Sequence, residues 1–127
     1  MATKFKLTRD INGYNGFGLP FTDTAYSVTL SANTDTSLTV PAASAPGGAS
    51  YSGSAKPLLV ALFQYDPGTS VWVANNTTAA APGGSSFAAT ASELNPSARE
   101  VHGGDVLHFL STGTGVNVSV NFYWLGQ

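Results

Sequence analysis

Apolar and polar residues alternate along several stretches of the chain, with the period of two that is typical of a half-buried β-strand. Residues 116–124 give the clearest case, because apolar side chains occupy every second position and Asn, Ser and Tyr lie between them. The apolar positions of this stretch are Val116, Val118, Val120, Phe122 and Trp124. Shorter spans with the same pattern predict strands at residues 26–30, 37–40 and 106–110.

A continuous apolar run at residues 58–63 departs from this alternation and predicts a strand that is buried on both faces. The sequence Asp-Pro-Gly-Thr at 66–69 is typical of a turn, and it joins the run to residues 71–73 as a hairpin. A further short strand is expected at residues 87–90. No stretch shows a helical period, so we predict an all-β fold with a single antiparallel β-sandwich, of the jelly-roll or Greek-key kind.

The first 24 residues follow neither period, and they combine aromatic side chains with glycines and Pro20, which prevent a regular helix. We therefore divide the chain into an extended N-terminal arm, residues 1–24, and a β-sandwich domain, residues 25–127. Two interpretations of the arm remain open. It wraps its own domain and covers a sheet edge, or it becomes ordered against another protein.

Charged residues make up only 9% of the chain, against a typical share of about 25%. The net charge of −2 argues against a nucleic-acid partner, which needs a basic surface. The lack of cysteine excludes disulfides and thiolate sites, and no apolar run is long enough for a signal peptide or a membrane span, so we expect folding in a cytoplasm. Residues 36–55 and 67–92 carry no charge at all, which suits a protein held permanently against identical copies or a large scaffold.

Candidate chemistry is sparse. His102, Asp105 and His108 are close in sequence and offer one interpretation as a metal cluster. We favour a turn histidine and a half-buried strand histidine, because His108 shares a strand face with Val106 and Leu110. The sequence contains no G-x-S-x-G elbow and no dinucleotide fingerprint, so we expect no catalytic residue, no metal and no cofactor.

Two aromatic residues are candidates for an exposed contact, Trp72 and Tyr65, which would allow stacking on a sugar ring. Trp72 stands between Val71 and Val73, so it lies on the outer face of its strand if the two valines point inward. Whether it is buried or exposed stays open at this point. A carbohydrate- or receptor-binding β-sandwich module is therefore the alternative function.

Four segments resemble the capsid decoration, or cement, proteins of tailed bacteriophages. They are T-R-D-I-N-G-Y-N-G-F-G-L-P-F from Thr8 to Phe21, V-W-V-A-N-N from Val71 to Asn76, S-E-L-N-P-S-A-R from Ser92 to Arg99, and G-G-D-V-L-H-F from Gly103 to Phe109. The resemblance covers most of the chain and implies a non-enzymatic protein that binds outside the capsid, on the virion surface, after synthesis in the host cytoplasm.

The same resemblance implies the partners and the contact residues. The partners are the major capsid protein and further copies of the chain, with a trimer favoured, and neither nucleic acid nor a membrane is expected. The residues implied to contact the capsid or a neighbouring copy are Tyr14, Phe17, Leu19 and Phe21.

Overall fold

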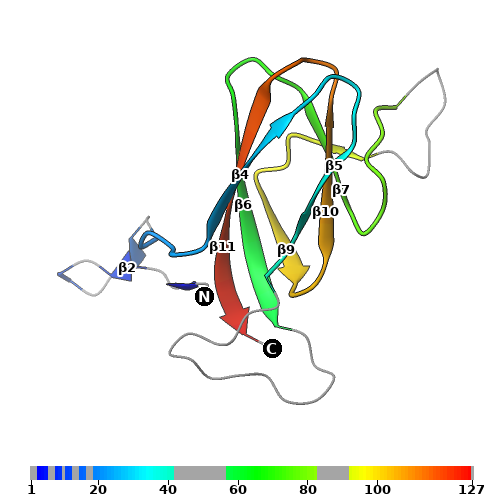
Figure 1. Cartoon of the computed structure of the whole chain (residues 1–127). Coiled ribbons are helices and arrows are strands. Elements are labelled where there is room, and N and C mark those ends of the chain that lie inside the picture. The colour runs from blue at the N-terminus through cyan, green and yellow to red at the C-terminus, as the bar shows by residue number, and fades with distance from the viewer. Residues whose placement is uncertain are drawn as a thin grey trace.

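The computed structural model describes residues 3–5, 8–9, 11–12, 15–16, 19–41, 57–82 and 92–126. Two β-sheets pack face to face in this part of the chain, and no helix occurs in it (Figure 1). The strands, in chain order, are β1 (Thr3–Lys4), β2 (Thr8–Arg9), β3 (Asn15–Gly16), β4 (Ala25–Leu30), β5 (Thr36–Thr39), β6 (Leu58–Tyr65), β7 (Val71–Asn75), β8 (Glu93–Leu94), β9 (Ala98–His102), β10 (Val106–Ser111) and β11 (Val116–Gly126).

The strand order of the two sheets is that of a jelly roll. One sheet runs β4-β11-β6-β9, with β1 beside the far end of β11, and the other runs β5-β10-β7-β8. Four antiparallel pairs are nested within one another along the chain: β4 with β11, β5 with β10, β6 with β9 and β7 with β8. The predicted β-sandwich is confirmed. Of the jelly-roll and Greek-key arrangements that we expected, the strand pairing matches the jelly roll.

The core lies between the sheets and is built from the alternating positions of the strands. On β11 the predicted inward positions are all buried, from Val116 to Trp124. They meet Phe109 and Leu107 of β10, Val71 and Val73 of β7, and Leu59, Ala61 and Phe63 of β6 in one cluster. Each buried valine, leucine or phenylalanine of this kind stabilises the fold by roughly 1.5–3 kcal/mol relative to an exposed position.

The burial of strand β6 differs from the expectation. The apolar run predicted burial on both faces, but only Leu59, Ala61 and Phe63 are buried, whereas Leu58 and Leu62 are partly exposed. The reason is that β6 lies inside an antiparallel sheet whose second face meets no packed layer among the described residues. The expected strand at 87–90 lies outside the described residues.

Candidate functional site

The N-terminal segment is fixed to the sandwich at both of its ends. Strand β1 pairs in parallel with the end of β11, and the Phe5 amide continues this pairing by donating to the Trp124 carbonyl at 2.8 Å. On the return path, the Thr22 hydroxyl donates to the Phe122 carbonyl at 2.8 Å, and the Phe122 amide donates to the Thr24 carbonyl at 3.0 Å. The described residues on either side of the segment 6–21 therefore both contact β11, and we call this segment the N-terminal loop.

Hydrogen bonds between the two ends close this loop at its base. The Thr3 amide donates to the hydroxyl oxygen of Thr22 at 3.3 Å, and the Asp23 amide donates to the hydroxyl oxygen of Thr3 at 3.1 Å. The base also covers Tyr123, which points outward from β11 and yet is only 5% exposed. Phe5 lies edge-to-face against the Tyr123 ring, with the ring centroids 6.4 Å apart. The base of the predicted arm thus packs on its own domain.

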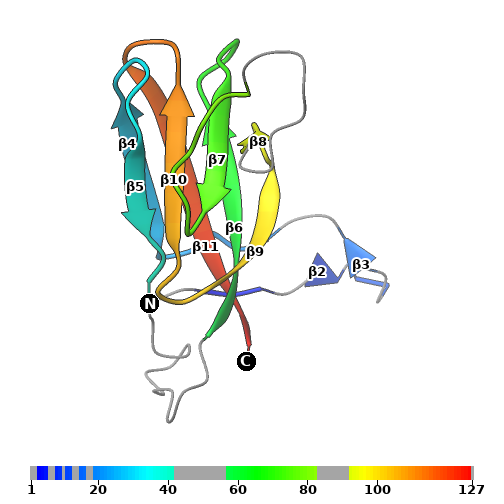
Figure 2. The same cartoon turned by 90° about the vertical axis from the view of Figure 1, so that its right-hand side faces the viewer.

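The described strands of the loop stand away from the sandwich. Strands β2 and β3 pair as a small antiparallel hairpin, and Figures 1 and 2 show this hairpin projecting to the side of the molecule. Ile11 in its turn is 99% exposed, and Phe21 near the base is fully exposed. Of the four residues expected to contact a partner, Phe21 is exposed, Leu19 is partly buried, and Tyr14 and Phe17 lie outside the described residues.

Trp72 lies on the outer face of the four-stranded sheet, because Val71 and Val73 on either side of it are buried in the core. Its cross-strand neighbours are Leu110 of β10 and Leu94 of β8, and Leu94 is exposed. The Trp72 side chain is itself partly exposed. A small apolar patch thus forms on this face.

Tyr65 points the other way, toward the core. Its ring stacks on Phe63 with an angle of 9° between the ring planes, and its hydroxyl donates to the Pro96 carbonyl at 2.6 Å. Burial raises the pKa of the Tyr65 hydroxyl, and the charges nearby have smaller effects: Arg99 lowers this pKa and Glu93 raises it. Its ring and hydroxyl are thus engaged within the sandwich.

The two histidines face different surroundings. His102 is exposed, whereas His108 is partly buried and its Nδ1 lies 2.8 Å from Oδ2 of Asp35. The Oδ2 atom of Asp105 accepts a hydrogen bond of 2.9 Å from the backbone amide of His102, and not from the ring of either histidine. No group of three potential metal ligands occurs in the described part of the chain. The structure therefore does not bring His102, Asp105 and His108 together as ligands.

The Asp35–His108 pair joins the turn before β5 to the outer face of β10. The second oxygen of Asp35 accepts the amide of Ala79 at 2.9 Å, so one carboxylate holds both the strand and the segment that follows β7. Ser37 is directly opposite His108 in the strand register and shares its face. Sequence reasoning missed this cluster because 73 residues separate Asp35 from His108.

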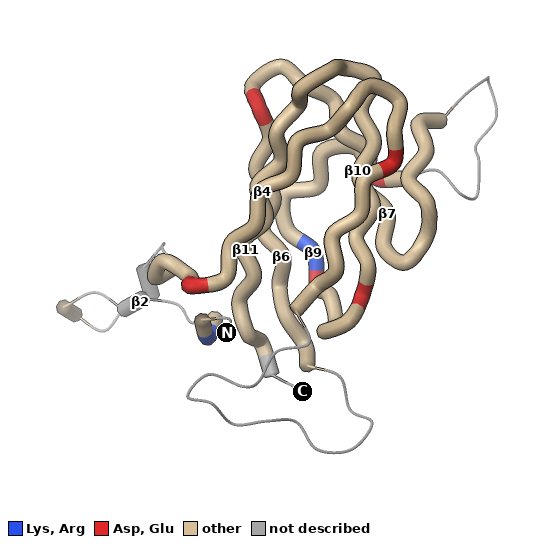
Figure 3. Tube along the Cα trace, in the orientation of Figure 1, with Lys and Arg blue, Asp and Glu red and all other residues tan. Residues whose placement is uncertain are grey.

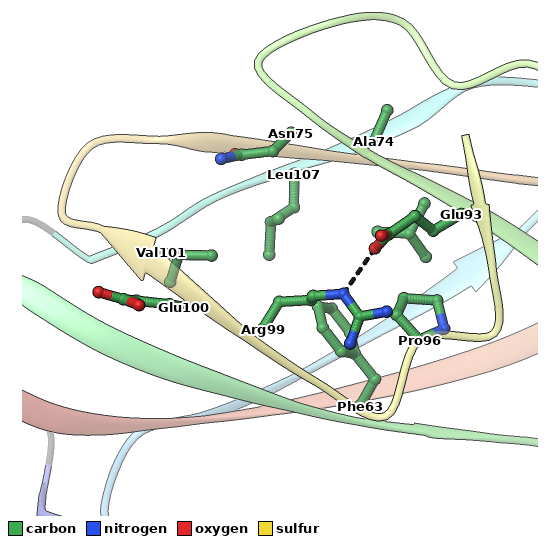
Figure 4. Close-up of a pocket in the computed structure, with 10 residues that line it drawn as sticks. Phe63, Ala74, Asn75, Glu93, Pro96, Arg99, Glu100, Val101 and Leu107 are labelled. Carbon is green, nitrogen blue, oxygen red and sulfur yellow. Dashed lines mark hydrogen bonds and ion pairs between the residues drawn. The ribbon is translucent and has the colours of Figure 1, made fainter. Parts of the chain in front are cut away.

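A pocket of about 140 Å³ opens between the sheets, at the edge formed by β8 and β9. Its apolar floor consists of core side chains: Phe63, Val73, Val101 and Leu107. Its rim carries Glu93, Arg99 and Glu100, and Figure 4 shows Glu93 and Arg99 pointing toward each other across the opening. The Nε of Arg99 donates to Oε2 of Glu93 at 2.6 Å, in a solvent-exposed ion pair.

The register explains why the core is open here. Glu93 is opposite Val73, and Arg99 is opposite Ala61, so both charged residues occupy core-facing positions of their short edge strands. Cross-strand neighbours share one face of a sheet, so an apolar residue at these positions would fill the gap. The two charged side chains instead form an exposed ion pair across the opening, and the space above the apolar floor is left unfilled.

Charged residues are few and lie far apart along the described part of the Cα trace (Figure 3). Helices able to cross a membrane are not found within the described ranges. Comparison of the chain with protein-family models, with curated proteins and with solved structures finds no match.

Proposed function

We propose that this chain is a non-enzymatic structural protein of a tailed-bacteriophage virion, which binds the outside of the capsid and stabilises it. The observation that carries the proposal is the N-terminal loop. It is clamped to β11 at its base, it projects from a rigid sandwich, and it presents Ile11 and Phe21 to solvent. Apolar side chains held in this way are suited to become buried in a partner.

The composition of the surface supports the same function. A protein with 9% charged residues lacks the dispersed charge that keeps a free monomer in solution. Small polar side chains lose little conformational entropy when a partner immobilises them. A jelly roll supplies a rigid block, and many weak contacts on one large shell add up through effective concentration. The resemblance of the four sequence segments to decoration proteins points to the same class of partner.

The test is co-sedimentation with empty heads of the phage that carries the gene. A loop-shortened variant, with residues 7–19 replaced by a Gly-Ser linker, keeps Thr3, Phe5 and Thr22 and so keeps the clamp on β11. We expect the full chain to sediment with the heads and the loop-shortened variant to remain in the supernatant. Leu94→Ser is the matched control, since it removes an exposed apolar side chain elsewhere and should leave binding unchanged. Equal binding by the full chain and the loop-shortened variant would refute the role of the loop.

The alternative function, a carbohydrate- or receptor-binding module, is favoured by Trp72 alone. Its partly exposed ring lies beside Leu94 and Leu110 on an outer sheet face, where a sugar ring can stack. Titration with a panel of sugars, monitored by tryptophan fluorescence, tests this function. Binding that Trp72→Ala abolishes would support it, and an absence of binding to any sugar would favour the capsid function.

A further inference from the structure

Strands β4, β5, β8 and β9 lie at the edges of the two packed sheets. Proteins protect such edges from pairing with another chain by short strands, charged side chains and proline. Strand β9 carries Arg99 and Glu100. Strands β5 and β8 are short, with four and two residues, and a proline follows each of them two positions after its end, Pro41 and Pro96. Three of the four edges are therefore protected.

Strand β4 is instead longer, regular and uncharged. Its six residues pair with β11 without a register shift, and of these six only Leu30 is buried. Figure 2 shows β4 and β5 together along one side of the sandwich and the β2–β3 hairpin beyond the opposite side. Residues 24–34 and 36–55 contain no charged side chain. This side of the molecule thus has an open strand edge without the charge that would repel a neighbouring strand.

Alternate residues of β4 direct their backbone groups to the free edge. In an antiparallel pair, every second residue exchanges hydrogen bonds with the partner strand, and the residues between them point the other way. The Phe122 amide donates to the Thr24 carbonyl at 3.0 Å, which sets the phase of this alternation along β4. The amides and carbonyls that point to the edge, where no described strand lies, are those of Ala25, Ser27 and Thr29.

Two apolar side chains are partly uncovered at the same edge. Tyr26 is opposite Val120, and Val28 is opposite Val118. Both valines of β11 are in the core, and cross-strand neighbours share one face, so Tyr26 and Val28 are on the core side of the sheet. Tyr26 is nevertheless 42% exposed, with its ring edge-to-face on Phe122, and Val28 is partly exposed. A further strand beside β4 would cover both side chains.

We propose that this further strand is β4 of a second copy of the chain, paired antiparallel about a two-fold axis at Ser27. Among the two-fold registers, the one centred at Ser27 pairs all three edge-directed residues of both copies, with Ala25 of each copy opposite Thr29 of the other. Tyr26 of each copy then lies opposite Val28 of the other, which is a favourable aromatic and β-branched combination.

The same register brings no like charges together, because β4 carries none. The exposed apolar residues and the free backbone groups of β4 are thus complementary to those of an identical strand. Through this contact the two five-stranded sheets become one continuous sheet.

Sedimentation equilibrium of the purified full chain, over a range of concentrations, measures the association. We expect the mass to rise from 13.0 kDa toward twice this value. Ser27→Pro should weaken the association by at least about tenfold, because it removes an edge-directed amide from each copy. The single chain tolerates proline there, since this amide bonds to no strand of its own sheet. Ser27→Ala is the matched control, because it keeps the amide, and its association should persist.

Disulfide formation tests the register, since the chain has no cysteine of its own. In the proposed pair the two Cα atoms of residue 27 are about 5.5 Å apart, within the range that a disulfide spans. Ser27→Cys should therefore give a covalent dimer under mild oxidation. Ala25→Cys and Thr29→Cys should each give none alone, whereas a mixture of these two variants should give a covalent heterodimer.

Three results would overturn the dimer. They are a full chain that stays monomeric at every concentration, an association, trimeric or other, that a folded Ser27→Pro variant retains in full, and a covalent dimer that Thr29→Cys forms as readily as Ser27→Cys. Melting temperatures near that of the unaltered chain show which variants are folded. If Ser27→Pro does not fold, the cysteine variants decide the outcome.

This dimer goes beyond the proposed function and does not rest on it, because every measurement uses the purified chain without phage heads. Loss of head binding together with an intact Ser27→Cys dimer would refute the proposed function alone. Head binding by a chain that forms no such dimer would refute the β4 contact alone.

Discussion

The hydroxyl of Tyr123 donates a hydrogen bond of 2.5 Å to the carbonyl oxygen of Pro20, which lies 103 residues earlier in the chain. Tyr123 faces outward from β11, at a position where a tyrosine would otherwise be exposed. Through this hydrogen bond and the contact with the Phe5 ring, Tyr123 binds both ends of the N-terminal loop to the outer face of β11. The loop is therefore held by its base while its tip remains free.

Tyr123→Phe should loosen the base of the loop without unfolding the sandwich. The substitution removes one hydrogen bond, which costs about 1 kcal/mol, and keeps the ring that packs against Phe5. Amide hydrogen exchange should become faster at Thr3 and Phe5, whereas exchange in the core strand β10 stays unchanged. Unchanged protection at Thr3 and Phe5 would show that the bond to Pro20 does not hold the base.

The sequence predicted the sandwich because its strongest strands have a clear alternation. The inward positions of β11 and β10 follow directly from the period of two. The sequence left the position of Trp72 open, because it depends on the direction of the two valines beside it, which the structure shows to be inward. The edge strands β8 and β9 gave no such signal, because Glu93 and Arg99 occupy core-facing positions that normally carry apolar residues. The same two charged residues explain why the pattern did not predict β8 and β9 and why a pocket is present between them.

Local sequence patterns could not predict the hydrogen bonds that hold the base of the N-terminal loop on β11. Strand β1 has two residues, and its partner Tyr123 lies at the opposite end of the chain. The Asp35–His108 pair is likewise formed by the jelly-roll pairing of β5 with β10 and not by sequence proximity. A periodicity shows which face a residue occupies, but it does not show which distant strand lies beside it.

Two leucines of β6 should differ strongly in their contribution to stability. Leu59→Ala empties a fully buried position and should cost about 2–5 kcal/mol. Leu62→Ala changes a partly exposed position on the outer face and should cost clearly less. Urea denaturation of both variants measures the difference, and equal losses would mean that the outer face of β6 is buried in solution.

Asp35→Asn should release the segment after β7. The carboxylate of Asp35 contacts His108 of β10 through one oxygen and accepts the backbone amide of the buried residue Ala79 through the other. The asparagine side chain has only one oxygen, so it cannot accept both hydrogen bonds equally well. We expect a loss of about 1–2 kcal/mol and faster hydrogen exchange at Ala79. Ser37→Ala is the control, since Ser37 is exposed on the same face and should leave exchange at Ala79 unaltered.

Asp105 should make the stability of the protein depend on pH in the acid range. Burial raises the pKa of Asp105, but hydrogen bonds from the His102 amide and from the side chains of Asn76 and Asn75 outweigh it, so the pKa lies below its ordinary value. A lowered pKa in the folded state means that the ionised carboxylate stabilises the fold. This contribution is fully present above the pKa of the unfolded aspartate, about 3.9, and is lost as the pH falls through the folded value.

Asp105→Asn tests this assignment because asparagine keeps the shape but lacks the charge. We expect a loss of about 2–3 kcal/mol at pH 7, since three hydrogen bonds to an ionised acceptor are weakened. The difference from the unaltered chain should shrink as the pH falls from about 3.9 through the lower pKa of folded Asp105, where its carboxyl group becomes neutral like the asparagine amide. Glu100→Gln, which alters an exposed acid on β9, should show no comparable loss. A difference that stays constant between pH 7 and pH 2 would contradict the ionised state of Asp105 in the fold.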